Sequence, residues 1–135
     1  MAVIPWTDKY SVRIEKIDEQ HKKLVSYINQ LYEAMLNKNK EQVIIEILDG
    51  LTIYTVHHFR TEEQLMITHS YSDYNLHKKQ HEELEKKVTA FKESLLKGDR
   101  QIAIELAQFL KSWLINHIAS SDQILGKYLK TKGVN

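Results

Sequence analysis

The sequence contains no cysteine, which excludes disulfide bonds, thiolate metal sites and iron–sulfur clusters. Its single proline is Pro5, so no proline interrupts a helix anywhere in residues 18–129. Acidic and basic residues nearly cancel, with 18 of the former and 19 of the latter, so no net charge attracts nucleic acid or an anionic membrane. No apolar run reaches the length of a signal peptide or a membrane span, and we expect a cytoplasmic protein.

Histidine, by contrast, is abundant, with seven residues in a chain of 135. It is the commonest metal ligand in proteins and the main side chain that titrates near neutral pH. A hydrophobic content of 42% is enough for a buried core in one domain of this length. The histidine positions therefore have to be compared with the pattern of core residues.

Apolar residues recur at steps of three and four through most of the chain, which predicts helices, and no strand-like alternation occurs. The expected helices cover residues 18–37, 41–68, 73–97 and 100–129. Short connections between four helices predict an all-α fold, an up-down-up-down antiparallel four-helix bundle within one domain, residues 1–135. Residues 1–17 are expected to form an extended arm, and residues 18–129 the bundle.

The predicted helix ends rest on capping residues. Asp18 is the expected N-cap of the first helix, Ser72 or Asp73 that of the third, and Asp99 that of the fourth. Gly98 is expected just after the end of the third helix, where a left-handed backbone favours glycine. In the arm, large apolar side chains are expected to pack on the bundle: Trp6, Tyr10, Val12 and Ile14.

Polar residues interrupt the core-facing row of each predicted helix. In the second helix the row reads Ile44, Leu48, Leu51, Thr55, His58, Glu62, Leu65. The rows of the other helices contain His21, then His77 and His81, then His117. Asp122 lies on a neighbouring row. It is five residues from His117, about 140° around an α-helix, so spacing alone does not pair them and favours Ser120 or Ser121 as the next core-facing residue.

These five histidines and two carboxylates fall in one half of an up-down-up-down bundle, so we expect them to converge in its interior. A buried imidazole or carboxylate is costly without a partner. Seven ligands are too many for one ion and suit two ions bridged by the two carboxylates. Imidazole with carboxylate and no sulfur favours iron over manganese or zinc. His57 and His69 are expected outside this cluster, at the surface and at a helix end.

Four motifs in order resemble those of single-domain bacterial hemerythrins, over nearly the whole chain. They are Ile17-Asp18-Glu19-Gln20-His21, His58-Phe59-Arg60-Thr61-Glu62-Glu63, His77-Lys78-Lys79-Gln80-His81, and Trp113-Leu114-Ile115-Asn116-His117 continuing to Asp122. The resemblance implies two iron ions with an oxo or hydroxo bridge. It assigns His77, His81 and His117 to one iron, His21 and His58 to the other, and Glu62 and Asp122 to both as bridges.

The resemblance also implies an open position on the two-histidine iron, where dioxygen binds reversibly. It places Trp113, Leu114 and Ile118 around that pocket, although their helical spacing alone indicates ordinary core residues. The expected function is non-enzymatic dioxygen binding for storage, transport or sensing.

An alternative is a diiron oxidase or peroxidase, but such ferritin-like centres use four glutamates and two histidines. A second alternative is an iron- or oxygen-responsive signalling module, which would need a separate partner. A redox or oxygen-accepting partner protein stays open, as does the choice between a monomer and a weak homo-oligomer.

Overall fold

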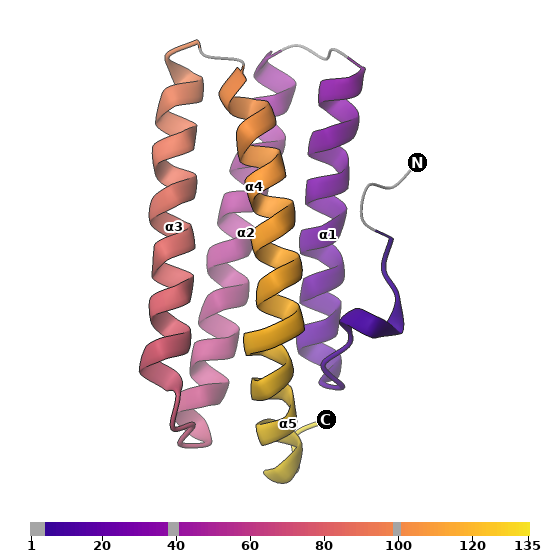
Figure 1. Cartoon of the computed structure of the whole chain (residues 1–135), viewed down its shortest axis with the longest axis vertical. Coiled ribbons are helices and arrows are strands. Elements are labelled where there is room, and N and C mark those ends of the chain that lie inside the picture. Colours follow the sequence, from indigo (N-terminus) through magenta and orange to yellow (C-terminus); the bar gives the residue numbers. More distant parts are fainter. Residues whose placement is uncertain (1–4, 38–40, 99–100) are drawn as a thin grey trace.

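The computed structural model describes residues 5–37, 41–98 and 101–135, which fold into a bundle of long helices (Figure 1). The elements are a 3₁₀ turn η1 (Asp8–Tyr10), α1 (Glu15–Leu36), α2 (Glu41–Thr68), α3 (Tyr74–Leu96), α4 (Gln101–His117), a π-helical turn η2 (Ile118–Asp122) and α5 (Gln123–Thr131). The last three follow one another without a break and form the fourth helix of the bundle. The described residues contain no strand, and the predicted all-α class is confirmed.

The helices alternate in direction along the chain, so the end of each helix and the start of the next lie at the same end of the bundle (Figure 1). Helix α1 packs on α2, α2 on α3, and α4 on both α3 and α1, so the four helices close around one interior. The predicted up-down-up-down antiparallel topology is therefore confirmed.

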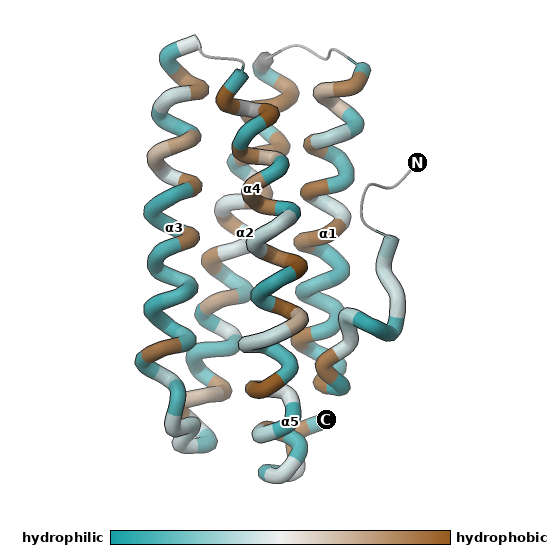
Figure 2. Tube along the Cα trace, viewed as in Figure 1, coloured by the Kyte–Doolittle hydropathy of each residue, from teal (hydrophilic) through white to brown (hydrophobic). Residues whose placement is uncertain are grey.

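Each helix turns one row of residues toward this interior. The buried row of α3, for example, is His77, His81, Leu84, Val88 and Leu95. Figure 2 shows hydrophobic residues recurring along each helix among hydrophilic ones, as expected for helices with one buried face. No helix in the described part of the chain is long and apolar enough to cross a membrane.

The apolar core is divided into two clusters. The larger one fills the bundle from Leu24 to the end at which α1 stops and α2 begins. It includes residues such as Ile28, Leu48 and Leu110. The smaller one lies at the other end, where Val12, Ile14, Ile17, Met66, Tyr71, Leu125 and Leu129 pack together. The buried histidines and carboxylates occupy the helix positions between the two clusters. The polar layer is thus closed from both ends by apolar packing.

The N-terminal arm contains more regular secondary structure than expected. It includes the 3₁₀ turn η1, and α1 begins at Glu15, three residues before the predicted start. Asp18 is therefore not an N-cap, and this prediction was wrong. Its carboxylate lies in the first turn and accepts hydrogen bonds from the Val12 N–H (2.8 Å) and the Ser11 hydroxyl (2.5 Å). These bonds fasten the arm to α1, with Val12 and Ile14 buried beneath it.

The other helix ends are close to those predicted. Gly98 follows the last residue of α3 by two positions and has a φ of 96°, the left-handed conformation that glycine adopts at helix ends. Asp73 occupies the N-cap position of α3, but its side chain makes no capping hydrogen bond. Asp99 lies outside the described residues.

Candidate metal centre

All seven candidate ligands meet in the polar layer, and none is more than 6% exposed. They are His21 on α1, His58 and Glu62 on α2, His77 and His81 on α3, His117 at the end of α4, and Asp122 at the end of η2. On α2 and α3 the two residues are four apart, so both side chains leave the same face of the helix. Every helix of the bundle therefore contributes to one cluster.

The π-helical turn η2 explains the pairing of His117 with Asp122 across five residues. A π turn bonds residue i to residue i+5 and takes up one residue more than an α-helical turn. It brings Asp122 Oδ1 to 3.1 Å from His117 Nε2. The expectation that Ser120 or Ser121 would continue the core-facing row was wrong, because the extra residue moves Asp122, 1% exposed, into that place. The row then continues with Leu125.

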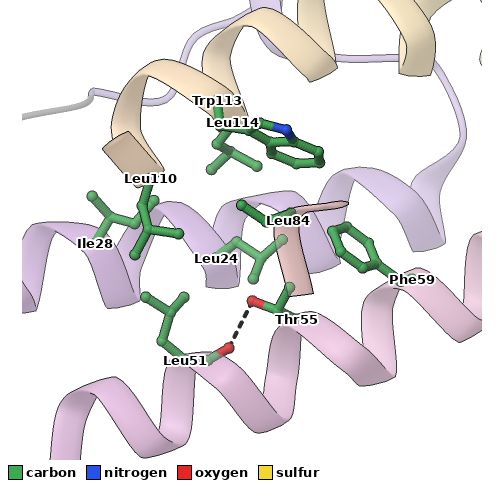
Figure 3. Close-up of a pocket in the computed structure, with 9 residues that line it drawn as sticks. All are labelled: Leu24, Ile28, Leu51, Thr55, Phe59, Leu84, Leu110, Trp113 and Leu114. Atoms are coloured by element: carbon green, nitrogen blue, oxygen red, sulfur yellow. Dashed lines mark hydrogen bonds between the residues drawn. The ribbon is translucent and has the colours of Figure 1, made fainter. Parts of the chain in front are cut away.

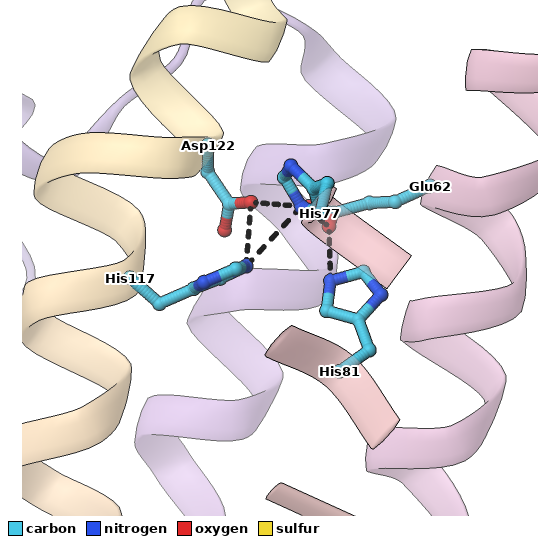
Figure 4. A group of neighbouring side chains, drawn as sticks. All are labelled: Glu62, His77, His81, His117 and Asp122. Carbon is cyan, nitrogen blue, oxygen red and sulfur yellow. Dashed lines mark hydrogen bonds and ion pairs between the residues drawn. The ribbon is translucent and has the colours of Figure 1, made fainter. Parts of the chain in front are cut away.

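Three of the histidines form one group with the carboxylates (Figure 4). Glu62 Oε1 lies 3.2 Å from Nε2 of His77 and 3.1 Å from Nε2 of His81. Asp122 Oδ1 lies 3.1 Å from Nε2 of both His77 and His117. The candidate ligand atoms of this group all lie within 4.8 Å of one another, a compact set of five donors.

The remaining two histidines form a second group with the same carboxylates. Glu62 Oε2 lies 3.2 Å from His58 Nε2 and 3.5 Å from His21 Nε2. Asp122 Oδ2 lies 3.0 Å from His21 Nε2. Each carboxylate therefore turns one oxygen to each group, which is the arrangement of a carboxylate that bridges two neighbouring cations.

Several of these atoms have no hydrogen-bond partner among the described residues. They are Nε2 of His21, Nε2 of His81, Oε2 of Glu62 and both oxygens of Asp122, all fully buried. Buried polar atoms without partners are costly and uncommon in folded proteins. The donor set thus fits bound metal ions, as histidine nitrogens and carboxylate oxygens readily coordinate them.

The electrostatics of the protein chain alone point the same way. Burial would by itself raise the pKa values of Glu62 and Asp122, but the surrounding imidazoles hold both well below their usual range. Burial would lower the pKa values of His21 and His77, yet the two carboxylates raise each to about 9. Burial lowers the pKa of His58. Without metal ions, protons on His21 and His77 compensate the buried anions, and metal cations would take over that role.

Two residues that sequence reasoning did not select stand behind the candidate ligands. The Nδ1 atom of His81 lies 3.0 Å from Glu63 Oε2, and that of His58 lies 2.7 Å from Gln20 Oε1. An ionised carboxylate and an amide oxygen only accept, so both rings donate from Nδ1 and keep Nε2 free for the cluster. Helical spacing pairs His58 with Glu62, one turn away, and does not select Glu63. The signal that could have found Glu63 and Gln20 is a buried polar residue next in sequence to a candidate ligand.

A small cavity lies one turn further into the bundle from the cluster, and Figure 3 draws the residues that line it. Its volume is about 20 Å³, roughly the space of a single water-sized molecule. Its lining residues are Leu24, Ile28, Leu51, Thr55, Phe59, Leu84, Leu110, Trp113 and Leu114. The Phe59 ring stacks on His81 at 3.8 Å and the Trp113 ring on His117 at 4.4 Å, so both separate the cavity from the cluster.

The three predicted pocket residues are placed differently by the structure. Trp113 and Leu114 line the cavity, whereas Ile118, 1% exposed, belongs to the adjoining core and is not among the lining residues. His57 is exposed and packs against the Tyr54 ring, outside the cluster as expected. His69 lies just beyond the end of α2, also outside it.

Comparison with known proteins agrees with this geometry. The family described as the hemerythrin HHE cation binding domain matches residues 12–129. A bacteriohemerythrin from Stenotrophomonas maltophilia (strain R551-3) is 33% identical over 130 residues, which cover 96% of this chain and 84% of that protein. Another, from Pseudomonas aeruginosa (strain UCBPP-PA14), is 36% identical over 122 residues, which cover 90% of this chain and 78% of that protein.

Similarity extends to solved structures. A crystal structure of a wild-type hemerythrin superposes on the chain with a TM-score of 0.88 at 28% sequence identity. The match covers 95% of this chain and 98% of that one. A point variant of hemerythrin gives a TM-score of 0.89 at the same identity, and covers 96% of this chain and 98% of its own.

Proposed function

This chain belongs to the hemerythrin family, and we propose that it binds dioxygen reversibly at a centre of two iron ions, as a binding protein and not as an enzyme. Two ferrous ions held by the seven side chains would supply the electrons that this binding requires. The observation that carries the proposal is the division of the carboxylate oxygens. Glu62 and Asp122 each offer one oxygen to the three-histidine group and one to the two-histidine group.

The balance of the ligands supports binding over oxidation catalysis. Oxygen-activating centres in ferritin-like bundles use four glutamates and two histidines, so their anionic charge stabilises highly charged iron. Here five imidazoles accompany two carboxylates. A centre with fewer anionic ligands stabilises high-valent iron less, which favours reversible binding of dioxygen over irreversible oxidation.

The cavity supports the same conclusion. None of its described lining residues carries a carboxyl, imidazole or amino group. The Thr55 hydroxyl is engaged in a 2.7 Å hydrogen bond to the Leu51 carbonyl oxygen (Figure 3). A wall of this kind offers no proton donor to drive further reduction, and apolar cavities tend to stay dry. Phe59, Trp113 and Leu114 would therefore exclude water and small anions while admitting a small apolar molecule.

Anaerobic reconstitution with ferrous iron tests the proposal. The protein should take up about two irons per chain, develop an oxygenated spectrum under air and lose it under vacuum, through repeated cycles. One metal ion per chain, or irreversible oxidation with turnover of peroxide, would contradict it.

Two adjacent histidines provide a matched pair of variants. His58→Ala removes a candidate ligand, 1% exposed, and should lower the iron content. His57→Ala removes an exposed ring one residue away and should leave the iron content unchanged. Equal iron loss in both variants would argue against the assigned cluster.

A further inference from the structure

The two histidine groups differ in the residues that accept hydrogen bonds from their imidazole rings. In the three-histidine group, the His81 ring donates to the carboxylate of Glu63, which is 5% exposed. In the two-histidine group, the His58 ring donates to the amide of Gln20, which is 6% exposed. Both acceptors are buried, so solvent hardly screens the difference between a charged and a neutral group.

The hydrogen bonds of Thr61 fix the orientation of the Gln20 amide. The Thr61 hydroxyl donates to the His57 carbonyl oxygen at 3.1 Å, so it accepts from the Gln20 Nε2 group at 3.2 Å. The amide oxygen of Gln20 is thereby turned to His58. A flip of the Gln20 amide would break its hydrogen bonds to both Thr61 and His58. The His58 ring thus faces the neutral amide oxygen.

Arg60 stabilises the negative charge of Glu63, the carboxylate that accepts the hydrogen bond from His81. Arg60 Nη1 donates to both oxygens of Glu63, at 2.9 and 3.0 Å, which keeps that carboxylate ionised. Arg60 is shared with Glu85 through Nη2 and is half exposed, so solvent screens its positive charge. The carboxylate of Glu63 therefore keeps most of its effect on the His81 ring.

We propose that Glu63 and Gln20 make the two metal positions electronically unequal, so that the ion on the three-histidine side is the easier one to oxidise. This inference rests on the proposed diiron function. A carboxylate that accepts the N–H of a ligand imidazole increases the basicity of that ring, and a more basic ligand stabilises the more highly charged ion. An amide oxygen does so less.

The inequality suits the division of roles between the two sides. Glu63 favours the oxidised state on the side where three histidines and two carboxylates leave the least room for a further ligand. Gln20 leaves the ferrous state favoured on the two-histidine side, where one histidine fewer leaves more room for a further ligand. Glu63 and Gln20 are thus positioning residues that act through His81 and His58.

Glu63→Gln tests the charge with little change of shape, since an amide oxygen can still accept from His81. Spectroelectrochemical titration of the iron-loaded protein should resolve two one-electron steps. Removal of a partner behind a ligand typically weakens metal binding tenfold or more. In the variant, the preference of the site for the oxidised over the reduced ion should therefore fall about tenfold. This change raises the reduction potential of the first oxidation step by about 59 mV. Glu82→Gln, an exposed charge next to His81 in sequence, is the matched control and should leave both potentials in place.

Gln20→Glu is the converse variant and should lower the potential of the second step by a similar amount. Stepwise zinc titration adds a measurement free of redox chemistry. In Glu63→Gln the affinity for one of the two zinc ions should fall about tenfold. Unchanged potentials and zinc affinities in both variants would overturn the inference, even if dioxygen binding proved reversible. Shifted potentials in a protein that oxidises irreversibly would uphold it and refute the proposed function.

Discussion

Thr55→Val is the sharpest test of how the cavity protects the centre. Thr55 is 8% exposed and supplies the one hydroxyl group among the described residues that line the 20 Å³ cavity. Its oxygen donates to the Leu51 carbonyl at 2.7 Å, yet it can still accept a hydrogen bond from a water molecule that enters. Valine has nearly the same shape without this polar group.

The expected magnitudes follow from this one group. The variant loses a hydrogen bond worth about 1 kcal/mol and gains a buried methyl group worth about 0.8 kcal/mol, so the free energy of unfolding should change by less than about 1 kcal/mol. A water molecule in the cavity loses a partner worth about 1 kcal/mol, which lowers its occupancy about fivefold. If entering water drives loss of the oxygenated state, autoxidation should slow by about the same factor.

The assay is the decay of the oxygenated spectrum at fixed temperature and oxygen pressure. Thr52→Val is the matched control, because the Thr52 hydroxyl makes the same bond to the Leu48 carbonyl at 2.8 Å on the same helix, and Thr52 does not line the cavity. Equal decay rates in Thr55→Val, Thr52→Val and the unaltered protein would refute the reasoning.

Three other expectations concern stability and the pocket. His21 and His77 have pKa values of about 9 in the folded chain, against an ordinary 6.5. Their protonation therefore stabilises the metal-free protein fully below pH 6.5, and this stabilisation is lost as the pH rises through about 9. Urea unfolding at a series of pH values would measure the loss. Gly126→Ala places a Cβ 2.5 Å from the Val12 carbonyl oxygen, so the arm must shift, and thermal unfolding should show a loss of about 1–3 kcal/mol. Ile118→Glu buries an unpaired charge, and should cost roughly 3–5 kcal/mol in urea unfolding and hasten autoxidation.

Each of these has a control or a contradicting outcome. Metal-loaded protein should not lose stability between pH 6.5 and 9, because its ligand imidazoles are already neutral, and a flat profile in the metal-free protein would refute the assigned protonation. Gly50→Ala is the control for Gly126→Ala, since its Cβ meets only the movable Tyr27 ring, at 3.0 Å. An unchanged autoxidation rate in Ile118→Glu would show that the core beside the cavity does not protect the centre.

The fold could be predicted from the sequence because helical periodicity is local. Steps of three and four, an absence of proline after Pro5 and short connections leave few alternatives to a four-helix bundle. The same pattern selected His58 over His57 and Glu62 over Glu63, because only that pair lies one turn apart on the buried face. Metal ligation by these residues stays a prediction until metal analysis is done.

Asp122 shows the limit of periodicity. A regular α-helix turns it about 140° from His117, and nothing in the local pattern announces the π-helical turn that corrects this angle. Asp18 shows a second limit, since its role depends on an arm that folds back over the first turn of α1.

The sequence by itself thus determined the helices and most of the side chains that reach the interior, because each helix obeys one short-range period. That period did not select three buried polar residues, Gln20, Glu63 and Asp122. The tertiary structure alone decided how their atoms meet. It divided the oxygens of Glu62 and Asp122 between two histidine groups, inserted the π turn, and placed Glu63 and Gln20 behind two of the rings. These features depend on the approach of different helices within a few ångströms, and no period along a single chain encodes such distances.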